Sequence, residues 1–115
     1  MKTDVADFHA AWKSDLQKIK TLSPETARAF GGLHHAMMKD GALATKEKEL
    51  IAMAIGLTQG CTECVFLHTE GAKKAGATRE QILEAAGVAV MMQGGPAFAH
   101  LPVVLAALEH PAAQA

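Results

Sequence analysis

Residues 50–57 read Leu-Ile-Ala-Met-Ala-Ile-Gly-Leu, an unbroken apolar run of eight residues. A helix that spans a membrane needs about 20 apolar residues, so this run is too short to cross a bilayer. A helix that is apolar on all sides is typical of the interior of a protein, where neighbouring elements enclose it. We therefore expect a central helix that has Thr45 as its N-cap and ends before Gly60.

The segments on either side of this run carry helical signals of their own. Apolar residues at a 3.6-residue period follow Val5, and Ser23-Pro24 predicts a helix start with serine as N-cap and proline in the first position. Thr78 and Gln81 have the spacing of a capping box, and Gly76 is suited to end the preceding helix in a left-handed conformation. We expect helices at residues 5–19, 24–39, 45–59, 61–75, 79–92 and 96–108.

The composition agrees with a small helical protein. The chain has 115 residues, of which 50% are hydrophobic and 20% charged, while aromatic residues make up only 4% and tyrosine is absent. Such a chain is long enough for one core and too short for two ordinary domains. We predict a single all-α domain over residues 1–115, folded as a compact bundle of about six helices.

The charge balance excludes several classes of partner. Eleven Lys and Arg are spread along a chain of net charge −1, which gives no basic surface for nucleic acid or for an anionic membrane. The first residues include two acids and lack the apolar segment of a secretory signal. We therefore expect a cytoplasmic protein without a nucleic-acid or membrane partner.

Both cysteines of the chain lie close together, at Cys61 and Cys64. With His68 they occupy positions i, i+3 and i+7, so all three side chains project from one face of the predicted helix. Cys61 lies at the predicted N-terminus, where free amides and the helix dipole favour a thiolate. His68 titrates near neutral pH and is placed to move a proton to or from the neighbouring thiol.

Glu49 is the fourth candidate residue. It precedes the apolar run, and a carboxylate that faces a core needs a polar partner, which His68 would supply. A carboxylate bonded to an imidazole fixes its tautomer and strengthens it as a base. The adjacent His34 and His35 point to different helix faces, so we assign them no role. Three glycines, Gly56, Gly71 and Gly87, lie inside predicted helices, and we expect close helix packing at each.

The combined spacing is specific. Glu49 is followed by eleven residues, then by Cys61-Thr62-Glu63-Cys64, three more residues and His68. In this pattern the chain resembles the alkylhydroperoxidase D-like family of the carboxymuconolactone decarboxylase superfamily. The similarity extends from about Leu43 to Gly95. The first forty residues match only loosely.

This resemblance implies an all-helical antioxidant enzyme that reduces hydroperoxides with a cysteine pair, which a dithiol donor of the lipoyl type then reduces again. By position, it makes Cys61 and Cys64 the redox pair, His68 the relay histidine and Glu49 its carboxylate. Short members commonly form trimers or hexamers, so the resemblance also implies a homo-oligomer. Glu63 departs from the pattern, because well-known members have a second histidine there, and a carboxylate between two thiols opposes thiolate formation. Decarboxylases of the superfamily generally lack the cysteine pair.

Two further interpretations of the cysteines stay open. A CxxC pair supplies half of a structural zinc site, with His68 as a third ligand, although no second CxxC follows. The pair also suits a disulfide reductase, or an oligomeric redox sensor, that does not turn over peroxide. Our leading expectation is a thiol peroxidase with no tightly bound cofactor and no metal. In it Cys64 attacks the peroxide and Cys61 resolves the sulfenic acid, with the reverse order as the alternative.

Overall fold

The structure is a computed structural model that describes residues 4–111. It confirms the all-α prediction, because these residues form helices joined by short turns and no strand. The helices are α1 (Val5–Leu22), α2 (Pro24–Met38), α3 (Thr45–Thr58), α4 (Thr62–Lys74), α5 (Arg79–Gln93) and α6 (Gly95–Leu108). Within this part of the chain no helix has the length and hydropathy needed to cross a membrane.

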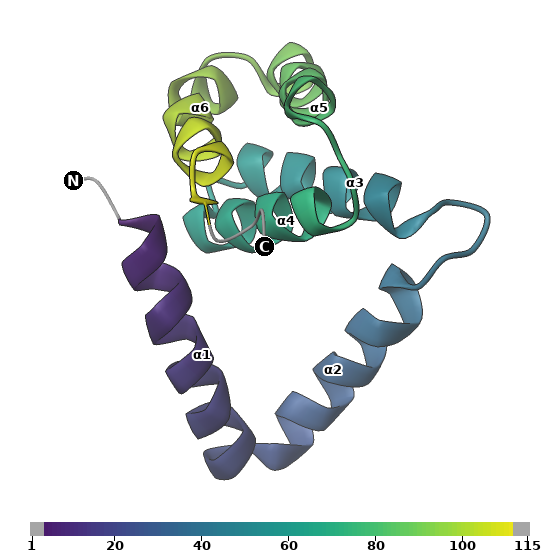
Figure 1. The fold of residues 1–115 in the computed structure, drawn as a ribbon, viewed down its shortest axis with the longest axis vertical. Coiled ribbons are helices and arrows are strands. Elements are labelled where there is room, and N and C mark those ends of the chain that lie inside the picture. The colour runs from purple at the N-terminus through teal and green to yellow at the C-terminus, as the bar shows by residue number, and fades with distance from the viewer. Residues whose placement is uncertain (1–3, 112–115) are drawn as a thin grey trace.

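Helices α3 to α6 pack together and form the main hydrophobic core (Figure 1). Its largest fully buried side chains include Met53 and Leu57 from α3, Val65 from α4, Ile82 from α5 and Val104 from α6. Alanines fill the narrow positions between them, at Ala72, Ala86 and Ala97, each of which is completely buried. Small side chains let helix backbones approach, and they fill this core where aromatic residues are scarce.

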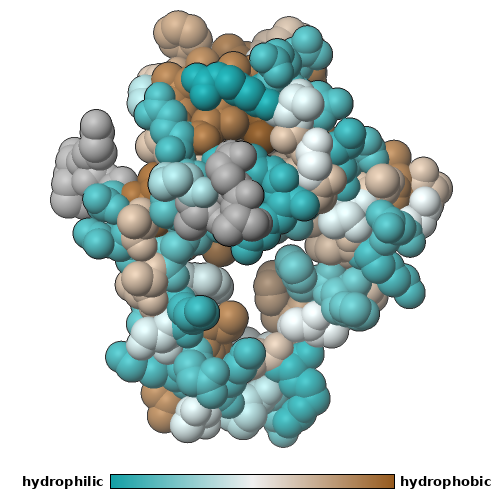
Figure 2. Space-filling view, in the orientation of Figure 1, coloured by the Kyte–Doolittle hydropathy of each residue, from teal (hydrophilic) through white to brown (hydrophobic). Residues whose placement is uncertain are grey.

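Helices α1 and α2 form a V-shaped arm that extends from this body (Figures 1 and 2). The start of α1 is attached by a small second cluster, in which Val5 and Phe8 pack near Phe66 of α4. Helix α2 buries none of its residues, and its Phe30 side chain is 65% exposed. The compact bundle is therefore the α3–α6 part, and the first two helices present much of their apolar surface to the outside.

The central helix is not enclosed on all sides, contrary to the expectation from its apolar run. Met53, Gly56 and Leu57 of α3 are buried, but Ile51 and Ile55 are about half exposed. Helix α3 packs on α4, α5 and α6, and these helices cover only one of its faces. An apolar run indicates that a segment is shielded from water, but it does not indicate whether helices of the same chain or another surface cover it.

The helix ends confirm most of the predicted turn signals. Thr78 and Gln81 form the expected capping box, and Gly60 and Gly76 adopt positive φ values of 66° and 97°. Thr45 is not the N-cap of α3, because Ala44 takes that place and the Thr45 hydroxyl donates to the Met38 carbonyl at 2.8 Å.

Ser23 does precede α2, but its hydroxyl bonds the Thr26 hydroxyl rather than a backbone amide.

Candidate active site

The turn between α3 and α4 places the first cysteine. Gly60 donates its N–H to the Leu57 carbonyl at 3.2 Å, and Cys61 donates to the Gly56 carbonyl at 2.9 Å. This pair of bonds, with glycine in the left-handed conformation between them, is the Schellman motif that closes a helix. Because the motif ends at Cys61 and α4 begins at Thr62, the cysteine is fixed at the junction of the two helices.

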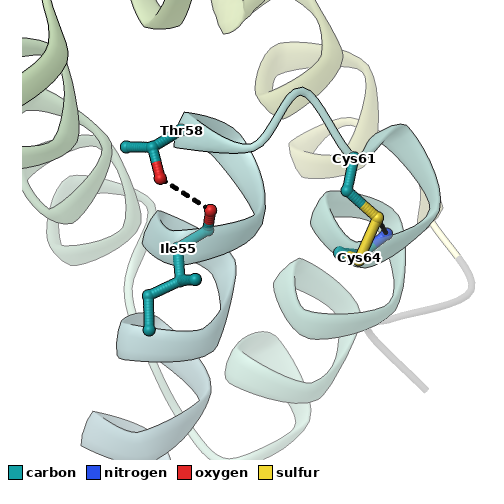
Figure 3. The surroundings of a disulfide bond; sticks show 4 residues. All are labelled: Ile55, Thr58, Cys61 and Cys64. Carbon is teal, nitrogen blue, oxygen red and sulfur yellow. Dashed lines mark hydrogen bonds between the residues drawn. A yellow bond between two sulfur atoms is a disulfide. The ribbon is translucent and has the colours of Figure 1, made fainter.

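Cys61 is also the N-cap of α4. Its sulfur accepts a hydrogen bond from the Cys64 backbone N–H at 3.1 Å, as a capping oxygen does in other helices. The two sulfurs form a disulfide, and the Cα atoms of Cys61 and Cys64 are 5.2 Å apart (Figure 3). Both cysteines are partly exposed. The pair thus combines an accessible disulfide with a helix N-terminus, which favours a thiolate when the bond is reduced.

Glu49 and His68 meet in the same region. The Nδ1 atom of His68 lies 2.7 Å from Oε1 of Glu49, at hydrogen-bond distance between side chains that are only 24% and 12% exposed. His68 follows Cys64 by one turn of α4, and Glu49 comes from the first half of α3. The predicted contact between carboxylate and imidazole is therefore present. An Nδ1–H that donates to the carboxylate leaves Nε2 as the nitrogen that exchanges a proton with a reactant.

Two glycines make room for this arrangement. A Cβ atom on Gly71 would stand 2.5 Å from Cδ of Glu49, and a Cβ atom on Gly56 would stand 2.7 Å from Cβ of Cys64. Glycine at position 56 lets α3 and α4 keep their spacing, and glycine at position 71 leaves room for the Glu49 carboxylate. The expectation of close packing is wrong for Gly87, which has no atom within 4 Å of its would-be Cβ.

A histidine without an assigned role lies beside the site. The ring of His34, on α2, stacks on the ring of His68 with centroids 6.3 Å apart. Sequence gave no signal for this contact, because residues 34 and 68 are on different helices and His34 is exposed. Glu63, by contrast, is in the first turn of α4 and points its carboxylate toward solvent.

Comparison with known proteins agrees with this geometry. Residues 24–108 match the model of the carboxymuconolactone decarboxylase family, which covers α2 to α6 and with them every residue of the candidate site. The chain belongs to this family. The matched segment also includes both glycines that accommodate Glu49 and Cys64.

Individual members of the carboxymuconolactone decarboxylase family share this fold and part of this sequence. The chain is 43% identical over 81 residues to an uncharacterized protein of the cox locus in Paracoccus denitrificans. The matched residues make up 70% of this chain and 73% of that protein. A family member from Legionella pneumophila with a crystal structure has 37% identity and a TM-score of 0.88, over 94% of this chain and 96% of its own.

A more distant relative of known activity class is the alkyl hydroperoxide reductase AhpD of Mycobacteroides abscessus. It is 33% identical over 75 residues, which cover 64% of this chain and 43% of the reductase. The chain thus spans less than half of the length of that enzyme. Together these findings confirm the resemblance to the alkylhydroperoxidase D-like family.

Proposed function

We propose that this protein is a thiol peroxidase that reduces organic hydroperoxides with its cysteine pair. The net reaction converts the hydroperoxide and the dithiol into an alcohol, water and the Cys61–Cys64 disulfide. The observation that carries the proposal is the disulfide at the start of α4 with the Glu49–His68 pair one turn further along the helix. The 33% identity with an alkyl hydroperoxide reductase supports it.

In the first step the Cys64 thiolate attacks the distal peroxide oxygen. The O–O bond breaks, the cysteine becomes a sulfenic acid, and His68 gives a proton to the departing alkoxide. In the second step the Cys61 thiolate attacks the Cys64 sulfur, and the hydroxyl leaves as water after it takes up a proton. A lipoyl-type dithiol then reduces the disulfide by exchange and completes the cycle.

Glu49 acts through His68 and does not touch the peroxide. Its carboxylate accepts from the imidazole Nδ1–H at 2.7 Å, which fixes the tautomer of the ring and leaves Nε2 for the proton transfer. Glu49→Gln should keep the shape of the contact and lose the charge. We expect slower disulfide formation with an altered pH profile.

The decisive experiment is a titration of fully reduced protein with one equivalent of cumene hydroperoxide, with peroxide loss and free thiols measured together. We expect peroxide loss within minutes and, by mass spectrometry, one intramolecular disulfide per chain. Cys64→Ser, which cannot form the disulfide, is the comparison, and His35→Ala, which changes an exposed histidine of α2, is the matched control. Thiols that persist while peroxide remains would refute peroxidase activity.

Single serine variants separate the roles of the two thiols. With Cys61→Ser, the sulfenic acid on Cys64 has no partner, so dimedone should trap it in stoichiometric amount. If dimedone instead labels Cys61 in the Cys64→Ser variant and labels nothing in Cys61→Ser, the order of attack is reversed while the peroxidase reaction itself stands.

Disulfide exchange without peroxide turnover is the second candidate, and Glu63 is the observation that favours it. Glu63 lies between the two cysteines in the sequence, in the first turn of α4, and a negative charge this close along the chain opposes a thiolate even though the side chain is exposed. Glu63→Gln should therefore speed the reaction with peroxide. If reduced protein ignores peroxide but reduces a protein disulfide, a reductase or redox-sensing function replaces the peroxidase.

We also propose that the protein works as a homo-oligomer, a trimer or hexamer. The support is the apolar surface that the single chain leaves exposed, which includes Phe30 on α2 at 65%, Met92 on α5 at 74% and Phe98 on α6 at 65%. Native mass spectrometry measures the assembly directly. A monomer at micromolar concentration would refute this proposal and leave the redox chemistry untouched.

A further inference from the structure

A second group of ligating side chains joins three separate segments of the chain. His9 lies on α1, Glu70 on α4, and His110 follows the end of α6. One nitrogen or oxygen of each residue lies within 4.8 Å of the others. None of these residues takes part in the proposed peroxidase reaction, and none was singled out by sequence.

The His9 side chain points its free nitrogen into this group. Its Nε2 atom is buried and has no hydrogen-bond partner among the described residues. The nearest carboxylate oxygen, Oε1 of Glu70, is 3.7 Å away, beyond a normal hydrogen bond. A neutral imidazole nitrogen without a hydrogen-bond partner is the form of histidine that binds metals.

The structure also fixes the approach of His110. The Nζ atom of Lys73 donates to its backbone carbonyl at 3.1 Å and to that of Leu108 at 2.7 Å. These bonds hold the segment after α6 against α4. The rings of His110 and His9 stack with centroids 5.1 Å apart, so the two imidazoles lie next to each other near the Glu70 carboxylate.

We propose that His9, Glu70 and His110 bind a divalent transition metal, with zinc as the best-suited ion. Two imidazole nitrogens and one carboxylate oxygen form a common ligand set for this ion, and a fourth position stays open to water. Ligand atoms around tetrahedral zinc stand about 3.4 Å apart. Binding of zinc therefore requires the imidazole rings to rotate out of their stack, so that the spacing within 4.8 Å closes to that value.

Two ammonium groups lie near Glu70: that of Lys73 is bonded to carbonyls at the end of α6, and that of Lys74 approaches the carboxylate itself. The Nζ atom of Lys74 lies 3.8 Å from the other oxygen of Glu70, but this lysine side chain is 61% exposed. It is therefore free to turn into solvent when a cation binds. The bound ion would link α1 to α4 and to the end of α6, next to the small cluster around Val5 and Phe66 that attaches the start of α1.

The test uses protein without an affinity tag and with the Cys61–Cys64 disulfide intact, so that no thiol is a ligand. Co²⁺ is titrated while its visible absorption is recorded, and Zn²⁺ is then added as a competitor. We expect a four-coordinate Co²⁺ spectrum with one ion per chain, displacement by Zn²⁺, and a higher Tm with Zn²⁺. His110→Ala and Glu70→Gln should each weaken binding by at least about tenfold.

Two histidine variants serve as controls. His35→Ala changes an exposed residue of α2, and His68→Ala removes the histidine beside the cysteines, so both should bind Co²⁺ as the parent does. Circular dichroism shows whether each variant is folded. If His110→Ala is unfolded, the comparison with the parent protein uses Glu70→Gln alone. Absence of the four-coordinate spectrum, its survival in Glu70→Gln, or its loss in His68→Ala would overturn the proposal.

Discussion

The most direct test of the α3–α4 packing is the substitution Gly71→Ala. The added Cβ would lie 2.5 Å from Cδ of Glu49 and 2.6 Å from each carboxylate oxygen, whereas nonbonded carbon atoms prefer about 3.5–4.0 Å. The end of the glutamate side chain must therefore shift by about 1 Å. Because the same carboxylate holds His68 at 2.7 Å, the shift breaks or bends that hydrogen bond.

Two opposing effects set the magnitude. Alanine is better than glycine inside a helix by about 1 kcal/mol, while loss of a hydrogen bond to a charged group costs about 1.5–3 kcal/mol. The net expectation for Gly71→Ala is a loss of about 0.5–2 kcal/mol in the free energy of unfolding. Gly87→Ala is the control, because nothing lies within 4 Å of its added Cβ, and it should gain about 1 kcal/mol.

The assay is urea unfolding of the oxidised protein at one fixed concentration, followed by circular dichroism, with NMR of the His68 ring nitrogens to detect the displaced carboxylate. A third measurement isolates the cause: in a Glu49→Ala background, Gly71→Ala should become stabilising by about 1 kcal/mol. The reasoning fails if Gly71→Ala stabilises as much as Gly87→Ala does, or if its cost is unchanged without the Glu49 carboxylate.

Three other outcomes follow from the same structure. Gly56→Ala should lower the free energy of unfolding, measured in urea, by about 1–3 kcal/mol. The reason is that its Cβ would stand 2.7 Å from Cβ of Cys64, an atom that no rotamer change can move away. An unchanged free energy of unfolding would contradict this close contact. Lys73→Met should cost about 1–3 kcal/mol and speed amide hydrogen exchange in the last turn of α6, whose carbonyls this ammonium binds; unchanged exchange would contradict that role. Burial holds the pKa of His9 below its ordinary value of 6.5. As pH falls through 6.5, the unfolded chain therefore takes up a proton that the folded chain does not. The free energy of unfolding should then fall by at most about 1.4 kcal/mol per pH unit. Urea unfolding at pH 7.5 and 5.5 checks the sign, and an equal slope in His9→Gln would show that other groups cause it.

The predictions that succeeded from sequence depend on interactions between near neighbours. The capping box at Thr78 and the left-handed glycines at 60 and 76 involve residues within a few positions of one another. The face shared by Cys61, Cys64 and His68 follows from helix geometry alone. The contact between Glu49 and His68 was within reach because a carboxylate beside an apolar run needs a partner.

The errors arose where distant helices decide the outcome. The apolar run of α3 indicated full enclosure, yet Ile51 and Ile55 are about half exposed, because the helices of one chain cover only one of its faces. Gly56, Gly71 and Gly87 look alike in sequence. Only the first two face another helix closely, and a helical period does not tell how near a neighbour lies.

The sequence by itself determined the helices of the described residues 4–111, the cysteine pair at the start of α4 and the family, because periodicity, caps and spacing involve residues that are close together in the sequence. Tertiary structure alone decided that α1 and α2 form an arm, that His34 stacks on His68, and that His9, Glu70 and His110 come together from three segments. These contacts depend on how helices cross and at what separation. Many weak packing interactions across the whole fold set those crossings, and no short stretch of residues encodes them.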